Sequence, residues 1–157
     1  MINISYDIKE YRKQLFDIAN DGNVIVELGC HVGNTTKLIL DKFDNVSIIA
    51  VDNSPEAIDK MEKLADEYSN LTFISGDVRR HEILLKAFRL AQKCDILSVD
   101  LGGGYHPDTV FKVFYIWSST FKPVHSIIRN KGLVDFCNSA VVGCEDFKSQ
   151  NGHLESY

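Results

Sequence analysis

The stretch 24–40 constrains the fold of this chain more than any other, because it joins three local patterns in a fixed order. Residues 24–26 are a short run of β-branched apolar side chains, which is typical of a buried parallel strand. Gly29 and Gly33 follow, and a pattern with helical spacing begins near Asn34. A strand, a glycine turn and a helix in this order predict the phosphate-loop geometry of nucleotide-binding α/β folds. A glycine turn that serves packing alone is the alternative.

Four predicted strands each end in a carboxylate side chain. After the first strand, the apolar runs 46–51, 71–75 and 95–99 follow along the chain. The carboxylates at the four strand ends are Glu27, Asp52, Asp77 and Asp100. Ligands of open parallel sheets bind at the edge where the strands end, so we expect these side chains to build a ligand site. Asp52 follows Gly29 at nearly the spacing of a ribose-binding carboxylate, which is about 20 residues.

These segments resemble the motifs of the class I S-adenosylmethionine-dependent methyltransferases, and the resemblance covers roughly residues 20–130. Residues 27–33 are similar to the first motif, acidic-x-Gly-x-Gly-x-Gly, with His31 where the middle glycine is commonest. The second, third and fourth motifs are similar to residues 50–54, 75–78 and 98–101. The fifth, usually Leu-Lys-Pro-Gly-Gly, is similar to residues 121–128 without its two glycines. Five motifs in family order identify the chain as a member of this family.

The resemblance implies an α/β fold, a three-layer Rossmann-like sandwich with a mostly parallel central sheet, in a single domain over residues 1–157. That length fits one domain. The family ends in an antiparallel hairpin, which we expect to be reduced or absent here, as in a small member with a shortened C-terminus. Residues 133–142 fit either a helix or a short strand pair, and the polar tail 149–157 is expected to fray.

Helical spacing predicts the crossover elements of this fold. Helices are expected at 6–20, 54–68, 81–92 and 108–120. Ser54 has the composition of an N-cap, because a proline and a glutamate follow it. The apolar spacing assigns Phe88 and Leu90 to the buried face of the third helix, and Phe111 and Tyr115 to the buried face of the fourth.

The resemblance implies S-adenosyl-L-methionine as the cofactor. It assigns the turn 29–33 to the methionine part, Glu27 to the amino group and Asp52 to both ribose hydroxyls. A carboxylate suits this last role because it offers only acceptors. Asp77 then accepts from the adenine amino group, and the Val78 N–H reads a ring nitrogen. The expected cofactor-binding residues are Glu27, Gly29, Cys30, Gly33, Asp52, Asn53, Gly76, Asp77, Val78 and Asp100. Turn formation or helix capping is the alternative for the two aspartates.

The acceptor side is expected in the stretch 100–108, where three glycines make a loop that moves or approaches a ligand closely. The expected catalytic residues are Asp100, Tyr105 and His106, and the expected substrate-binding residues are Gly103, Tyr105, His106, Arg129 and Asn130. His106 precedes a proline, which predicts extended backbone; a histidine bonded only to backbone is the alternative. Asp108 is expected to cap the following helix.

No metal site is predicted. The cysteines, Cys30, Cys94, Cys137 and Cys144, are scattered without a C-x-x-C pair, which favours reduced, mostly buried thiols over a zinc site. Cation-dependent catechol-type methyltransferases place Asp-Asn after the fifth strand, where this chain has Arg129 and Asn130. An arginine cannot ligate a hard cation. Arg129 is instead expected to receive an anionic group of the substrate or to pair with Asp100.

Composition bounds the partners. The net charge of −5 argues against clamping an extended nucleic acid, although residues 79–81 and 129–131 are candidates for a local basic patch. The chain lacks a bilayer-spanning apolar stretch and a secretory signal pattern, so no membrane association and a cytoplasmic location are expected. The partners expected are a small-molecule or protein methyl acceptor, with a homodimer as a further possibility.

Together these features predict an S-adenosylmethionine-dependent methyltransferase that works by in-line displacement without a metal, with the acceptor unassigned. Such a transfer needs mainly the correct placement of the reacting groups. One alternative is a non-catalytic S-adenosylmethionine-binding or partner-dependent interaction module. A nicotinamide-dependent oxidoreductase is disfavoured, because Gly29-x-x-x-Gly33 lacks the full G-x-G-x-x-G pattern and no catalytic domain follows.

Overall fold

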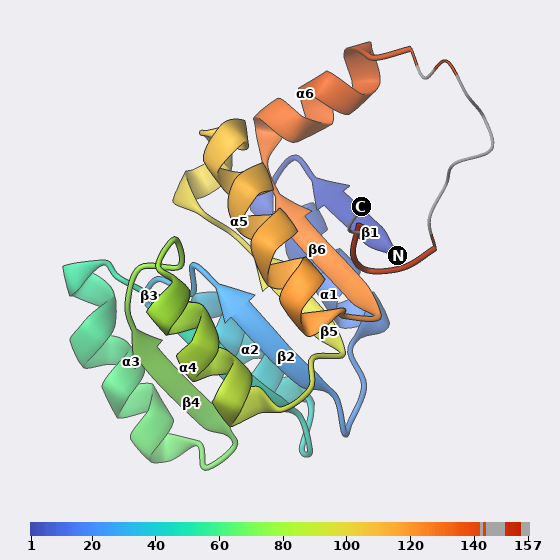
Figure 1. Cartoon of the computed structure of the whole chain (residues 1–157). Coiled ribbons are helices and arrows are strands. Elements are labelled where there is room, and N and C mark those ends of the chain that lie inside the picture. Colours follow the sequence, from blue (N-terminus) through green and yellow to red (C-terminus); the bar gives the residue numbers. More distant parts are fainter. Residues whose placement is uncertain (142, 144–149, 155–157) are drawn as a thin grey trace.

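A computed structural model describes residues 1–141, 143 and 150–154, in which strands and helices alternate along the chain (Figure 1). The elements are β1 (Ile2–Ser5), α1 (Ile8–Ile18), β2 (Val24–Leu28), α2 (Asn34–Lys42), β3 (Ser47–Asp52), α3 (Pro55–Glu67), β4 (Leu71–Ser75), α4 (His81–Ala91), β5 (Ile96–Val99), the 3₁₀-helix η1 (Gly102–Gly104), α5 (Pro107–Phe121), β6 (His125–Arg129) and α6 (Lys131–Ser139). The predicted helices are confirmed, and β1 is an additional strand.

All neighbouring strands are parallel, and their order in the sheet is β1-β6-β5-β2-β3-β4. From β2 the chain builds outward through β3 and β4, and it then returns to the other side of β2 with β5 and β6. Such a reversal opens a crevice at the carboxyl ends of the two central strands, and this crevice is where ligands of open α/β sheets bind. The topology therefore places the candidate site beside the ends of β2 and β5.

Helices cover both faces of the sheet, which confirms the three-layer Rossmann-like architecture. One core packs α1, α2 and α3 against alternate strand residues such as Ile25 and Ile48. The other core packs α4 and α5 against the intervening residues, among them Val26 and Ile49. In Figure 1, α4 and α5 lie in front of the sheet. Successive strand residues point to opposite faces, so each buried strand feeds both cores.

The C-terminal part differs from the sequence expectation in two ways. Residues 131–139 form α6, so the helix interpretation applies there and the strand-pair interpretation is wrong. Part of the tail expected to fray is instead packed, because the Ser126 hydroxyl donates to the Gly152 carbonyl and Leu154 contacts the second core. The predictions for Val142 and Cys144 lie outside the described residues. No helix of the described part is long and apolar enough to cross a membrane.

Two helices bury a narrower stripe than their composition suggests. Phe88 and Leu90 on α4, and Phe111 and Tyr115 on α5, are exposed, contrary to expectation. A helix lying on a flat sheet contacts it along one narrow face, so side chains a quarter turn away remain in solvent. The Phe88 ring still packs edge-on against a ring of α5, with 5.3 Å between centroids.

Candidate active site

A cavity of about 750 Å³ opens at the carboxyl edge of the sheet, next to the ends of β2 and β5. This size suits a cofactor together with part of a second ligand. Eight of the ten residues expected to bind cofactor line it: Glu27, Gly29, Cys30, Asp52, Asn53, Asp77, Val78 and Asp100. Gly33 and Gly76 do not line it. The four strand-end carboxylates thus lie around one cavity, as their positions in the sequence predicted.

Both glycines of the turn have a left-handed backbone and closely packed neighbours. Gly29 has φ +84°, and a Cβ atom there would lie 2.2 Å from the carbonyl oxygen of Asp100. Gly33 has φ +79°, and its Cβ would lie 2.6 Å from the Met61 sulfur on α3. Gly76 faces a side chain of α4 in the same way. Glycine at 33 and 76 therefore lets helices approach the sheet edge, and only Gly29 of these three also faces the cavity.

His31 holds the turn against the end of β3. It adopts a left-handed φ of 48°, which a non-glycine residue adopts at a cost of about 1–2 kcal/mol. Its backbone N–H donates to Asp52 Oδ2 at 2.7 Å, and its ring lies 3.3 Å from Glu56. His31 lines the cavity, although the sequence interpretation noted it only as a departure from the motif.

The sequence left open whether Asp52 forms a turn or binds a ligand. In the structure it forms the turn and also lines the cavity. Its Oδ1 atom accepts bonds from the Ser54 N–H at 2.7 Å and the Ser54 hydroxyl at 2.6 Å, while Oδ2 accepts from His31. A carboxylate has about four acceptor positions, so one remains open to a ligand. Ser54 occupies the N-cap position of α3, but its side chain bonds to Asp52 and does not cap the helix.

Glu27 is a buried carboxyl group at the base of the cavity. Its side chain is almost fully enclosed and accepts a 2.6 Å hydrogen bond from the Thr36 hydroxyl on α2. Burial raises the pKa of Glu27 to about 7, while the Thr36 bond opposes the rise and the charge of Asp100 adds to it. A cation placed beside this group would favour its ionised form.

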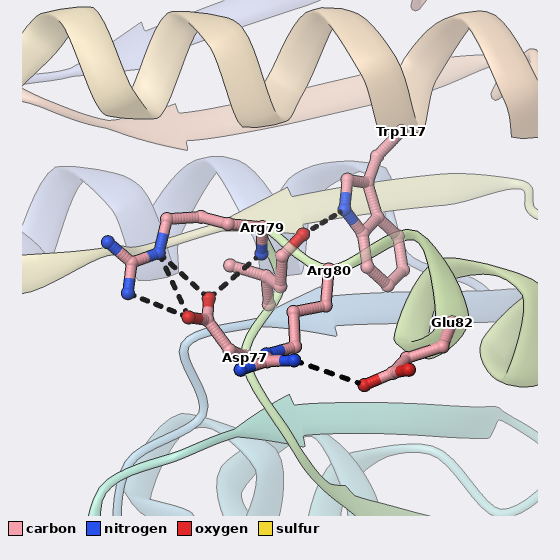
Figure 2. Close-up of polar contacts among 6 residues, drawn as sticks. Asp77, Arg79, Arg80, Glu82 and Trp117 are labelled. Atoms are coloured by element: carbon pink, nitrogen blue, oxygen red, sulfur yellow. Dashed lines mark hydrogen bonds and ion pairs between the residues drawn. The ribbon is translucent and has the colours of Figure 1, made fainter.

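Asp77 is held by a partner that the sequence interpretation did not include. Figure 2 shows the Arg79 guanidinium facing both Asp77 oxygens, at 2.7–3.0 Å. These hydrogen bonds are the main reason that the pKa of Asp77 is lowered. In the same loop, the Val78 carbonyl accepts a hydrogen bond from the Trp117 indole N–H at 2.8 Å. A ligand that bonds to Asp77 must therefore share it with Arg79 or displace Arg79.

Asp100 and Arg129 form an ion pair across the ends of β5 and β6. The Arg129 Nε–H donates to Asp100 Oδ1 at 2.7 Å, and both side chains are at least four-fifths enclosed. Burial raises the pKa of Asp100, and the bond from Arg129 opposes that rise. Of the two roles considered for Arg129, pairing with Asp100 is the one observed. The pair also lines the cavity, so an anionic ligand group can still reach the arginine.

The loop after β5 brings only part of the expected acceptor site together. The Tyr105 side chain is 65% exposed and does not line the cavity. Asn130 is fully buried: it caps α6 through the Leu133 N–H and donates to the Tyr105 carbonyl, both at 2.9 Å. Asn130 therefore positions the loop, and its burial leaves no surface for direct substrate contact. Gly103 lies in η1, a short helix that reaches the cavity lining through its first residue, Gly102.

His106 does line the cavity, but its backbone is not extended as expected. It has φ 55° and ψ 60° and occupies the N-cap position of α5. The steric rule before proline excludes chiefly the right-handed helical region, and the left-handed region turns the chain into α5. The expected cap, Asp108, instead lies in the first turn of the helix.

Helix α1 supplies a wall of the cavity through residues that the sequence interpretation did not name as site residues. Arg12 and Ile8 on this helix line the cavity, and the Arg12 Nε–H donates to the Thr35 hydroxyl on α2 at 3.0 Å. The pattern of α1 predicted its buried face, but only the pairing of β1 with β6 places its start over the sheet edge. With Arg79 and Arg129, Arg12 makes the cavity lining richer in arginine than the sequence suggested.

Comparison with known proteins gives two sequence matches. Residues 25–101 match the model of a family described as Methyltransferase domain. A malonyl-[acyl-carrier protein] O-methyltransferase of Halalkalibacterium halodurans is 31% identical over 64 residues, which are 41% of this chain and 24% of that protein. The chain thus matches about a quarter of the length of this relative.

Solved structures share the fold at low identity. Fibrillarin from Aeropyrum pernix, in complex with natively bound S-adenosyl-L-methionine, aligns with a TM-score of 0.56 and 20% identity over 72% of this chain and 48% of that one. A dimethyladenosine transferase from Plasmodium falciparum aligns with a TM-score of 0.58 and 17% identity, over 87% of this chain and 46% of that one. At these identities the likeness shows the fold alone.

Proposed function

Because the chain belongs to the class I S-adenosylmethionine-dependent methyltransferases by its fold and by the match over residues 25–101, we propose that it binds S-adenosylmethionine and methylates an acceptor. The observation that carries the proposal is one cavity at the reversal point of the sheet, with carboxylates at the ends of β2, β3 and β4. The cofactor would supply an electrophilic methyl group on a sulfonium.

The residues present fit the cofactor part by part. Glu27 is a buried carboxyl suited to an ammonium group, and Gly29 lines the same cavity. Asp52 has an open acceptor position for a ribose hydroxyl. Asp77 would accept from the adenine amino group once Arg79 yields one of its bonds, and the Val78 N–H would read a ring nitrogen. These are the roles expected from the sequence, and the residues that would fill them line one cavity.

We place the acceptor at the other end of the cavity, between Asp100, His106 and Arg129. All three line the cavity, whereas the Tyr105 side chain does not, so Tyr105 has no place in this proposal. In-line transfer requires the acceptor atom to be oriented, and a base is needed only if it arrives protonated. His106 is the candidate base. Metal assistance is not proposed, since Arg129 already occupies an oxygen of Asp100.

Asp52→Ala is expected to weaken binding of S-adenosylhomocysteine by about 1.5–3 kcal/mol, the range for hydrogen bonds to a charged group. Titration calorimetry measures this loss. The matched control is Ser54→Ala, which removes a turn bond but keeps the carboxylate, and it should leave affinity within about twofold. Equal losses in both variants would mean that Asp52 acts only through the turn.

His106→Ala is expected to lower turnover about tenfold or more, while the affinity for S-adenosylhomocysteine stays within about threefold, since acceptor contacts do not hold the cofactor. The assay follows methyl transfer to a panel of small-molecule and protein acceptors, with and without a chelator. Full activity of the variant would remove His106 from the reaction. Activity lost in chelator and restored by magnesium would contradict metal-free transfer.

A non-catalytic S-adenosylmethionine-binding module is the second candidate. Asp100 and Arg129, the charged side chains nearest the expected acceptor, already bond to each other and need no substrate as a partner. Cofactor binding without turnover on any acceptor, alone or with a partner protein, would favour it. Tight binding of a nicotinamide dinucleotide with no binding of S-adenosylmethionine would contradict both candidates. A cytoplasmic location is part of the proposal, since Cys30, Cys94 and Cys137 are free thiols.

A further inference from the structure

A second cavity, of about 430 Å³, lies beside the candidate active site between α4 and α5. Its walls come from the loop 78–80, the start of α4 and one face of α5. Val78, Arg79 and Thr109 line both cavities, so the loop is a shared partition. Figure 2 shows this loop and the hydrogen bond that joins it to Trp117. The proposed methyl transfer does not use this space.

The rim of the second cavity carries more positive than negative charge. Arg80 and Lys112 line it, and Asp108 is the one carboxylate among its described lining residues. Arg80 has only a long contact to Glu82, at 3.6 Å, between two side chains that are mostly exposed. Within the described residues, Lys112 has no ion pair, even though Asp108 is four positions earlier on the same helix. These cations are therefore available to a ligand.

The floor of the second cavity is apolar. Leu84, Val113 and Trp117 form it, and each is almost fully enclosed in the second core. Ile116 borders it from the exposed side of α5. An apolar floor below a cationic rim matches a ligand that has an apolar body and an anionic group, because each part then meets its complement.

We propose that the second cavity binds a small apolar molecule that carries a phosphate or carboxylate group, with the anion at Arg80 and Lys112. Charged groups recognise such anions through charge-assisted hydrogen bonds. A small molecule fits a bounded cavity of this size, which lies within the range of ligand pockets. The chain carries a net charge of −5, which disfavours an extended polyanion on this face.

The shared partition predicts coupling between the two cavities, a consequence that rests on the proposed function. An adenine amino group at Asp77 competes with the Arg79 guanidinium for the same carboxylate. A released Arg79 adds a cation to the wall of the second cavity. S-adenosylhomocysteine should therefore tighten binding of the anion, and by thermodynamic reciprocity the anion should tighten binding of S-adenosylhomocysteine.

Trp117 is the only tryptophan of the chain and lies in the floor of the second cavity, so its indole N–H gives a single NMR signal at this site. Titration with phenyl phosphate should shift the signal saturably. Inorganic phosphate should bind at least about threefold more weakly, because it lacks the apolar body. Lys112→Gln and Arg80→Gln should each weaken phenyl phosphate about threefold to tenfold. Lys86→Gln on α4, an exposed lysine outside the lining, is the matched control and should change nothing.

Benzoate in a parallel titration distinguishes a carboxylate ligand from a phosphate ligand. No saturable shift with either compound up to about 10 mM, a concentration that detects weak millimolar binding, would overturn the site. Equal loss in Lys86→Gln would overturn the assignment to this rim. Tighter binding of a single-stranded oligonucleotide through the same residues would overturn the assignment of a small-molecule ligand.

The coupling has its own test. A phenyl phosphate affinity that bound S-adenosylhomocysteine leaves unchanged would overturn the coupling, whereas failure of S-adenosylhomocysteine to bind would count against the proposed function alone.

Discussion

The Gly29→Ala variant is expected to lose about 3–5 kcal/mol of unfolding free energy, a large part of the total for a domain of ordinary stability. Two costs combine at this position. The backbone has φ +84°, which penalises any side chain, and the new Cβ would lie 2.2 Å from the Asp100 carbonyl oxygen. Because the obstructing atom belongs to the backbone, relief requires the end of β5 to move away from β2.

Gly22→Ala separates these two costs. Gly22 has nearly the same φ, +85°, but a Cβ atom there would meet no heavy atom within 4 Å. This variant should lose only about 1–2 kcal/mol, the penalty of the left-handed backbone alone. Urea denaturation of both variants measures the difference. Similar losses at the two positions would show that the Asp100 carbonyl moves aside easily, and that the turn is less tightly packed than the structure indicates.

The Glu27→Gln variant is expected to be more stable than the wild type above pH 7, by about 3 kcal/mol at most. The folded-state pKa of Glu27 is raised from 4.5 to about 7 by burial. Between these values the unfolded chain has lost the proton that the folded protein keeps, so the stability of the wild type falls as pH rises. Below the unfolded pKa both states are protonated, and the wild type and the variant should be equally stable.

Denaturation of the wild type and the variant at pH 4.5 and pH 8 tests this expectation, since the difference between them should grow with pH. The amide oxygen that the substitution introduces can still accept the Thr36 hydroxyl, so the change in packing is small. Binding of S-adenosylhomocysteine should weaken, because the variant cannot supply a negative charge to an ammonium group. Equal stability of the two proteins at pH 8 would contradict a buried, ionised Glu27.

The order of strands and helices, and the carboxylates at the strand ends, were predictable because they depend on local patterns. Alternating burial and glycine turns act over a few residues, and each appears in the sequence without its partners. For this reason Glu27, Asp52, Asp77 and Asp100 were assigned to one edge before their neighbours were known, and all four line the cavity.

The contacts of those same side chains depended on the tertiary structure. Arg79 holds Asp77, Arg129 holds Asp100, and Arg12 closes the cavity from α1. Asn130, expected to face the substrate, is enclosed beneath the loop it supports. The order of the strands and the packing of the helices decide which side chains meet, and both bring together residues far apart in sequence. The spacing within one segment therefore cannot predict these contacts.

The sequence by itself determined which chemical groups stand at the edge of the sheet, since each strand carries its own terminal residue. Only the tertiary structure decided which of them are open to a ligand. The second cavity illustrates the difference: the sequence marks Arg80, at the start of α4, only as part of a basic patch, and nothing in it singles out Lys112 on α5. Docking of α4 beside α5 gathers them over the buried Leu84 and Trp117, because both helices must cover the same face of the sheet.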